Sequence, residues 1–155
     1  MTSMQAIRIL LCTLVATGVL ATAAHADSGE KSDAAKYRHE VMEAMGSSFG
    51  NFILLYMNKV DQPDAHLIAN AQALALSASL TADLVPAGSE GGEALPAIWD
   101  EMDEYQKYAE EVANNTAALA DAAEAGDKAA MGKAFKAAGK SCKGCHDKFR
   151  EEHDH

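Results

Sequence analysis

Two cysteines and a histidine near the carboxyl end of the chain form the most chemically informative group in the sequence. Cys142 and Cys145 stand three positions apart, and His146 follows the second cysteine directly. Paired cysteines at this spacing serve as redox-active thiols, as half of a zinc site or as attachment points for a haem. The choice among these depends on the elements that position the motif.

Apolar residues recur with helical periodicity in four segments, and no strand pattern of any strength is present. The sequence predicts helices over about 32–60, from Pro63 to about 85, over 96–126 and after Asp127. Ser32 and Asp127 are the predicted N-caps of the first and last of these helices. The residues expected to face the core are Met42, Met45, Phe49, Phe52, Tyr56, Leu67, Ala71, Leu74, Ala78, Trp99, Met102, Ala109, Val112, Thr116, Met131, Phe135, Ala138, Cys142, Cys145 and Phe149.

The composition and the connections between these segments predict the fold class. Ala, Leu, Met, Glu and Lys are abundant, and the prolines stand at segment edges, which is typical of helical proteins. Two predicted connections are short, and one long loop covers residues 86–92. We therefore expect an all-α protein, an up-down-up-down antiparallel four-helix bundle.

The amino-terminal stretch has the pattern of a cleaved secretory signal peptide over residues 1–26. Arg8 precedes an apolar run at 9–21, and small residues surround a cleavage site after Ala26. The run is too short for a membrane span. The prediction is export to a bacterial periplasm as a single domain, residues 27–155, with no membrane attachment after cleavage. Cys12 lies in the removed segment.

The balance of charge restricts the partners of the chain. Thirteen basic and 23 acidic residues give a formal net charge of −10. That charge argues against nucleic acid and anionic membranes, and it predicts a redox partner protein with a basic docking surface. Residues suited to hydrolytic chemistry are not grouped in the sequence, so the protein is not expected to be an enzyme.

The three hypotheses for the cysteine motif can now be compared. A thioredoxin-like pair follows a strand and sits at a helix N-terminus, whereas this pair lies well inside the last helix. Zinc needs four ligands, and the remaining histidines form no ligand pattern: His39 and His66 are expected at surface positions, and His153 and His155 lie in a charged tail.

Haem attachment uses every part of the motif. Cys142 and Cys145 project from one face of a helix, about one turn apart, and can bond the two vinyl groups of one porphyrin. His146 then lies under the iron as an axial ligand. Export agrees with this chemistry, because haem is attached after translocation. The sequence predicts one covalently attached haem c with its iron.

The position of the motif supplies a resemblance to a known family. Cys142 to His146 lies on the last predicted helix and is followed by Phe149 and Arg150. The pattern Arg38-x-x-x-Met42-x-x-x-Gly46 lies on the first helix, and Ala97-Ile98-Trp99 opens the third. Across the whole mature chain, this arrangement resembles the class II cytochromes c, which are cytochrome c′ and its low-spin relatives.

The resemblance implies roles for individual residues. Cys142 and Cys145 become the thioether attachments and His146 the proximal ligand. Arg38 matches an arginine near the haem propionates, although a solvated surface arginine would fit the same pattern. Arg150 either lies beside the proximal imidazole or forms an exposed ion pair.

Further residues of the first and third predicted helices bear on the haem site. Met42 matches the sixth ligand of the low-spin members, with Met45 a weaker candidate, but the same side chain can also cover the iron without bonding it. Gly46 and Gly50 allow a macrocycle or a helix to approach closely, and Trp99 borders the haem edge or fills the core.

Two functions follow from these implied roles. The main prediction is a periplasmic monohaem cytochrome that transfers single electrons with His/Met ligation of iron. The alternative is a five-coordinate cytochrome c′ that binds nitric oxide or carbon monoxide. A homodimer formed through the first two helices is common in the family, and the sequence does not decide whether this chain forms one.

Overall fold

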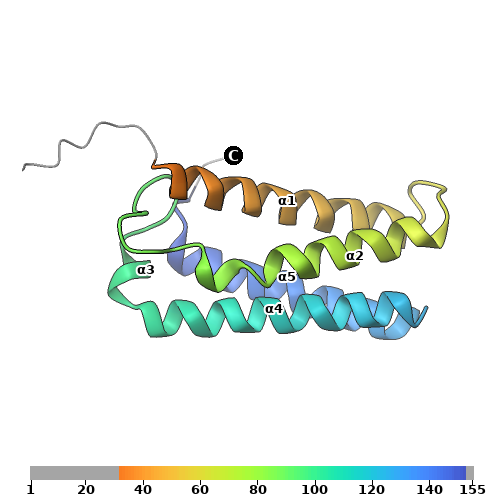
Figure 1. Cartoon of the computed structure of the whole chain (residues 1–155). Helices are drawn as coiled ribbons and strands as arrows, with labels where there is room; N and C mark the ends of the chain where they lie inside the picture. Colours follow the sequence, from red (N-terminus) through yellow and green to blue (C-terminus); the bar gives the residue numbers. More distant parts are fainter. Residues whose placement is uncertain (1–31, 153–155) are drawn as a thin grey trace, which may run out of the picture.

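The computed structural model describes residues 32–152, which form a helical bundle (Figure 1). Its long helices are α1 (Asp33–Tyr56), α2 (Asp64–Ala78), α4 (Met102–Glu124) and α5 (Lys128–Phe149). A 3-10 turn, η1 (Thr81–Asp83), and a short helix, α3 (Ala97–Asp100), lie between α2 and α4. Successive long helices run in opposite directions, and the all-α fold class is confirmed.

Two predictions concern the ends of the chain and lie outside the residues that the structure describes. They are the signal peptide over residues 1–26 and the placement of His153 and His155 in a charged tail. Within residues 32–152, no helix is both long and apolar enough to cross a membrane.

The two predicted N-caps are confirmed. The Ser32 hydroxyl accepts a hydrogen bond from the Ala35 N–H at 3.1 Å. The Asp127 carboxylate accepts from the N–H groups of Ala129 and Ala130 at 3.0 and 2.9 Å. Each cap supplies an acceptor to the N–H groups that a helix start leaves unpaired, so the local sequence fixes where α1 and α5 begin.

Two predicted helix ends are wrong, and one helix predicted as continuous is interrupted. The helix expected to reach residue 60 ends at Tyr56, because Asn58 adopts a left-handed φ of 52°. The one expected to reach residue 85 ends at Ala78 and continues only as η1. The third predicted helix is divided at Glu101, whose φ and ψ of −124° and 45° separate α3 from α4.

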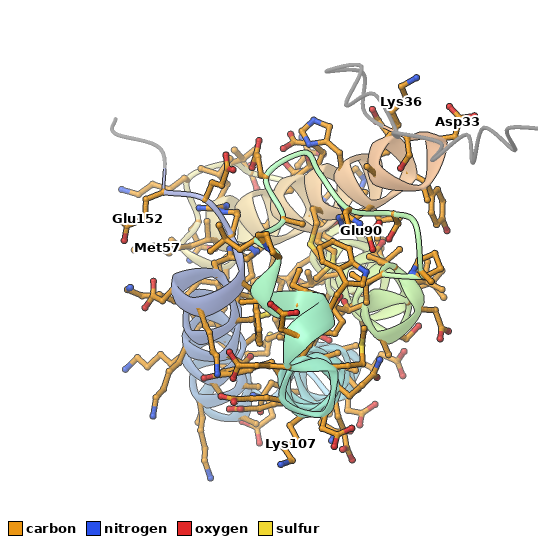
Figure 2. The ribbon with its side chains drawn as sticks, turned by 90° about the vertical axis from the view of Figure 1, so that its left-hand side faces the viewer. Asp33, Lys36, Met57, Glu90, Lys107 and Glu152 are labelled. Atoms are coloured by element: carbon orange, nitrogen blue, oxygen red, sulfur yellow. The ribbon has the colours of Figure 1, made fainter. Side chains whose placement is uncertain are left out.

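Most of the predicted inward-facing residues belong to two apolar clusters. The larger joins α1, α2, α4 and α5 around the fully buried Phe52, Leu74 and Leu119. The smaller gathers Ile98, Tyr105 and other residues around Phe149 near the start of α4. Seen end-on in Figure 2, the four long helices surround a common interior, so every helix contributes one face to the core.

The two ends of the bundle differ in how α1 meets α5. At one end, which we call the aromatic end, Phe49 and Phe52 of α1 stack on Phe135 of α5, with ring centroids 4.6 and 5.9 Å from it. Tyr56 also donates a hydrogen bond to the Lys128 carbonyl at 3.1 Å. The opposite end, where the loop from α2 to α4 crosses the bundle, we call the cavity end.

The loop of the cavity end is tied to the last residues of α5. The Leu95 N–H donates to the Phe149 carbonyl at 2.9 Å, and the Glu151 N–H donates to the Glu93 carbonyl at 2.8 Å. Ala94 and Arg150 form an isolated antiparallel bridge between the same two segments. These bonds place residues 92–94 beside the attachment motif, about 50 positions away in the sequence.

Candidate haem site

A cavity of about 350 Å³ lies between α1 and α5 at the cavity end. This volume is within the range of small-molecule and cofactor sites. Its walls combine apolar side chains of all the long helices with a few polar groups. The lining residues used below are Arg38, His39, Met42, Gly46, Gly139, Cys142, Cys145, His146 and Arg150.

The α5 wall of the cavity carries the whole attachment motif. Cys142, Cys145 and His146 all line the cavity, so the structure brings together the three residues that the sequence singled out. Burial raises the pKa of the Cys142 thiol, and burial with the nearby Cys142 raises the pKa of Cys145 to about 11. Reactive redox cysteines have lowered pKa values. These thiols therefore lack the electrostatics of a thioredoxin-like centre.

The environment of His146 favours the neutral imidazole. Burial, followed by the positive charge of Arg150, lowers the pKa of His146, although Asp147 and Glu93 act in the opposite direction. A neutral imidazole has a free nitrogen lone pair, which is what a metal ligand requires. Arg150 is itself exposed at the rim of the cavity, close enough to influence the imidazole.

The α1 wall distinguishes the two candidate methionines. Met45 is buried, and its sulfur accepts a hydrogen bond from the Thr81 hydroxyl at 4.0 Å. Met42 is half-buried, and it forms no hydrogen bond within the described part of the chain. The thioether of Met42 is therefore the one available to a bound group, as its position in the sequence pattern suggested.

Space beside Met42 suits a flat apolar group. A Cβ added to Gly46 would meet no atom within 4 Å, although Gly46 lines the cavity. On the opposite wall, a Cβ at Gly139 would approach the Phe49 ring at 3.4 Å. Paired thiols, an adjacent neutral imidazole, a thioether and this open space together fit a haem.

Arg38 is buried rather than solvated, so the surface alternative for this residue is wrong. Its side chain is 7% exposed and donates to the carbonyls of Leu84, Ser89 and Gly91 at 3.3, 3.0 and 2.7 Å. Burial lowers the pKa of its guanidinium. Arg38 therefore holds the loop of the cavity end while also lining the cavity; its pairing with a propionate stays a prediction.

Trp99 lies next to this arginine. The guanidinium carbon of Arg38 is 5.6 Å from the centre of the Trp99 ring, a cation–π geometry. The Trp99 side chain packs against the smaller cluster, and its Nε1 is buried without an acceptor in the described structure. A buried donor of this kind is costly unless it finds a partner, and a carboxylate of a bound group would supply one.

Sequence patterns missed two parts of the site. His39 was expected at the surface, but it is half-buried and lines the cavity; its position one turn before Met42 was the available signal. Glu93 and its neighbours also line the cavity. Nothing local predicts them, because pairing with residues 149–151 brings them there. His66 is exposed, as predicted.

Comparison with known proteins identifies the family. The family model described as cytochrome c′ matches residues 33–150. A cytochrome c′ from Alcaligenes xylosoxydans xylosoxydans is 32% identical over 120 residues, covering 77% of this chain and 94% of its own. The chain belongs to the cytochrome c′ family, whose members carry covalently attached haem c, and the architecture is a standard one for such proteins.

Solved structures of relatives have the same fold. A nitric oxide complex of a cytochrome c prime mutant from Alcaligenes xylosoxidans superimposes with a TM-score of 0.72 at 32% identity, covering 78% of this chain and 95% of that one. A carbon monoxide-bound variant from the same organism gives a TM-score of 0.73 at 32% identity, with 79% and 98% covered. The predicted family and cofactor are confirmed.

Proposed function

We propose that this protein is a periplasmic cytochrome c′ that binds nitric oxide or carbon monoxide within the cavity between α1 and α5. The observation that carries the proposal is the asymmetry of that cavity: Cys142, Cys145 and His146 line one wall, and the opposite wall offers open space at Gly46. The gas complexes of relatives at 32% identity support this function more strongly than our main prediction of a His/Met electron carrier.

The residues of α5 would hold the cofactor. The Cys142 and Cys145 thiols would form the two thioethers, and the neutral imidazole of His146 would supply one axial ligand. When bound, the haem supplies an iron that accepts a diatomic gas. Because His146 follows Cys145 directly, attachment of the porphyrin at Cys145 would hold the imidazole beside the iron.

The residues of α1 and the core would shape the gas-binding side. The Met42 thioether would cover this side without bonding the iron, and Gly46 would leave room beside it. Apolar side chains from the other helices, including Leu74 and Val112, also line the cavity. An apolar lining disfavours water and charged ligands, and it accepts a small uncharged gas.

Electron transfer with Met42 as the sixth ligand remains the second candidate. It is favoured by one observation: the Met42 sulfur has no hydrogen-bond partner in the described structure, whereas that of Met45 has Thr81. Met/His ligation raises the reduction potential and closes the iron to gases. The two candidates therefore predict opposite behaviour toward carbon monoxide.

Absorption spectra and carbon monoxide titration of the purified holoprotein separate these candidates. We expect a high-spin ferric spectrum, ready binding of carbon monoxide to the ferrous protein, and faster binding in Met42→Ala. Met45→Ala is the matched control, because it removes a thioether that Thr81 already engages. A low-spin wild type that excludes carbon monoxide and becomes high-spin only in Met42→Ala would establish the electron carrier instead.

Export forms a separate part of the proposal. The periplasmic location is supported by the signal-like pattern over residues 1–26. Intact mass of protein from the periplasmic fraction should correspond to residues 27–155 plus one haem. A mass that includes residues 1–26 would contradict cleavage, while leaving the gas-binding proposal untouched.

A further inference from the structure

The charges of the bundle are segregated between adjacent helices. Helix α5 contains six of the thirteen basic residues of the chain and a single acidic residue, Asp147. The neighbouring α4 contains six acidic residues and one lysine, Lys107. The strongly negative net charge of the protein therefore conceals one basic helix, which is also the helix that carries the attachment motif.

Four lysines of α5 form a stripe on its exposed side. Lys133, Lys136, Lys140 and Lys143 are spaced 3, 4 and 3 residues apart, which places them on one helix face, and all four are exposed. Figure 2 shows nitrogen-tipped side chains that extend from the ribbon of α5 away from the core. We call these four residues the lysine stripe.

Three lysines of the stripe have no acidic partner among the described residues. Lys143 pairs with Asp147 at 2.6 Å. In contrast, Lys133, Lys136 and Lys140 form no ion pair with any of residues 32–152. Unpaired like charges on one helix face repel one another. An acidic surface that covers these lysines would reduce the repulsion and lower the free energy of the complex.

Two members of the lysine stripe lie one helical turn from residues that line the cavity. Lys136 is one turn before Gly139, and Lys143 is one turn before His146, and both Gly139 and His146 line the cavity. A protein that covers the stripe therefore lies against the helix to which the haem is joined. This position suits a partner that exchanges electrons with the haem.

We propose that the lysine stripe docks an acidic redox protein. This occupant is opposite in charge to the partner that the net charge of the chain predicted. Screening limits the reach of exposed charges to about 10 Å at 0.1 M ionic strength, so the charges within the contact decide docking. The proposal goes beyond gas binding and requires only the covalently bound haem.

Cross-linking maps the docking face directly. The ferric holoprotein is mixed with an acidic flavodoxin and a water-soluble carbodiimide, which joins paired lysines and carboxylates as amides. We expect the cross-linked peptides to contain Lys133, Lys136 or Lys140, and to disappear when salt is raised to 0.5 M. Cross-links dominated by Lys36, Lys59 or Lys107, or cross-links that persist in high salt, would overturn the proposal.

Two charge-reversal variants separate the local charge from the net charge. The test variant replaces Lys133, Lys136 and Lys140 with Glu, and the control variant replaces three exposed lysines elsewhere (Lys36, Lys59 and Lys107) with Glu. Both change the net charge equally. Binding to immobilised flavodoxin should weaken at least about tenfold in the first and less than about threefold in the second.

Equal weakening in the two variants would mean that only net charge matters. The sign of the salt effect on wild type is a second criterion. Docking on the stripe predicts that added salt weakens binding, whereas repulsion between two acidic proteins predicts that added salt strengthens it. Circular dichroism and the haem spectrum verify that each variant is folded. Neither readout depends on carbon monoxide or nitric oxide.

Discussion

The aromatic end and the cavity end of the bundle are made by the same pair of helices in two different ways. At the aromatic end, the ring planes of Phe49 and Phe135 are 13° apart, with centroids at 4.6 Å, and α1 packs on α5 directly. At the cavity end, the two helices border a cavity of about 350 Å³. One end is filled by the chain's own side chains, and the other requires a bound group.

The difference arises within a single helical turn. On α1, Gly46 lies one turn before Phe49, and on α5, Gly139 lies one turn after Phe135. An added Cβ at Gly46 would meet no atom within 4 Å, whereas one at Gly139 would lie 3.4 Å from the Phe49 ring, so the glycine of α1 borders open space and the glycine of α5 packs against a ring. A change of side-chain size along the α1 stripe, from a ring at Phe49 to a hydrogen at Gly46, therefore contributes to the cavity without any change in the helical backbone.

The largest expected effect is the loss of haem attachment. In Cys142→Ala/Cys145→Ala, the apolar walls of the cavity are left to water, so the free energy of unfolding should fall on the order of 4 kcal/mol. Hydrogen exchange should increase at the cavity end and remain slow around Phe52. The measurements are thermal melting and exchange mass spectrometry. An unchanged melting temperature would show that the cavity end, like the aromatic end, is stable without haem.

Removing the ring at the aromatic end should have the next largest effect. Phe135→Ala deletes the ring that stacks on both Phe49 and Phe52. We expect a loss of about 3 kcal/mol in urea unfolding, near the lower limit for a phenylalanine because this ring is only partly buried. The haem spectrum should stay the same. A spectral change as large as that of a cavity-end variant would mean that the ends are not independent.

A polar contact supports the cavity end, and its loss should cost less. Arg38→Met keeps a long side chain but removes the donors to the Leu84, Ser89 and Gly91 carbonyls. Because hydrogen bonds to a charged group contribute about 2 kcal/mol, we expect a loss of that order and faster exchange over 84–95.

Arg38→Lys provides the control for this prediction. A single ammonium keeps the charge but cannot reproduce the two-nitrogen geometry, so only part of the stability should return. Full recovery would indicate that charge alone, and not the bonds to the loop, explains the effect.

The smallest effects come from two glycines of α1 that differ in position only. Added Cβ atoms at Gly46 and Gly50 meet nothing within 4 Å. Alanine is favoured over glycine inside a helix by about 1 kcal/mol, so Gly50→Ala should stabilise the holoprotein by that amount. Gly46→Ala should gain less or lose stability, because its methyl enters the cavity. Equal gains in urea unfolding would place the haem away from Gly46.

The sequence by itself determined the local structure and the chemistry of one wall. Helical periodicity and the Ser32 and Asp127 caps depend on residues within about four positions, so α1 and α5 start where predicted. Cys142 and Cys145 share a face for the same reason, which is why their side of the cavity was predictable. The interruptions of helices were harder to predict. Asn58 and Glu101 adopt non-helical backbone angles, and the spacing of apolar residues does not indicate such angles.

Only the tertiary structure decided what surrounds that wall. Arg38 and Gly91 are 53 positions apart, and Glu93 and Glu151 meet only because the loop and the end of α5 fold together. Contacts of this kind depend on how the helices pack, and they cannot be predicted from the spacing of residues along the sequence. The distinction between Met42 and Met45 has the same origin, because it is Thr81, from a different element, that engages the sulfur of Met45 and leaves that of Met42 at the cavity.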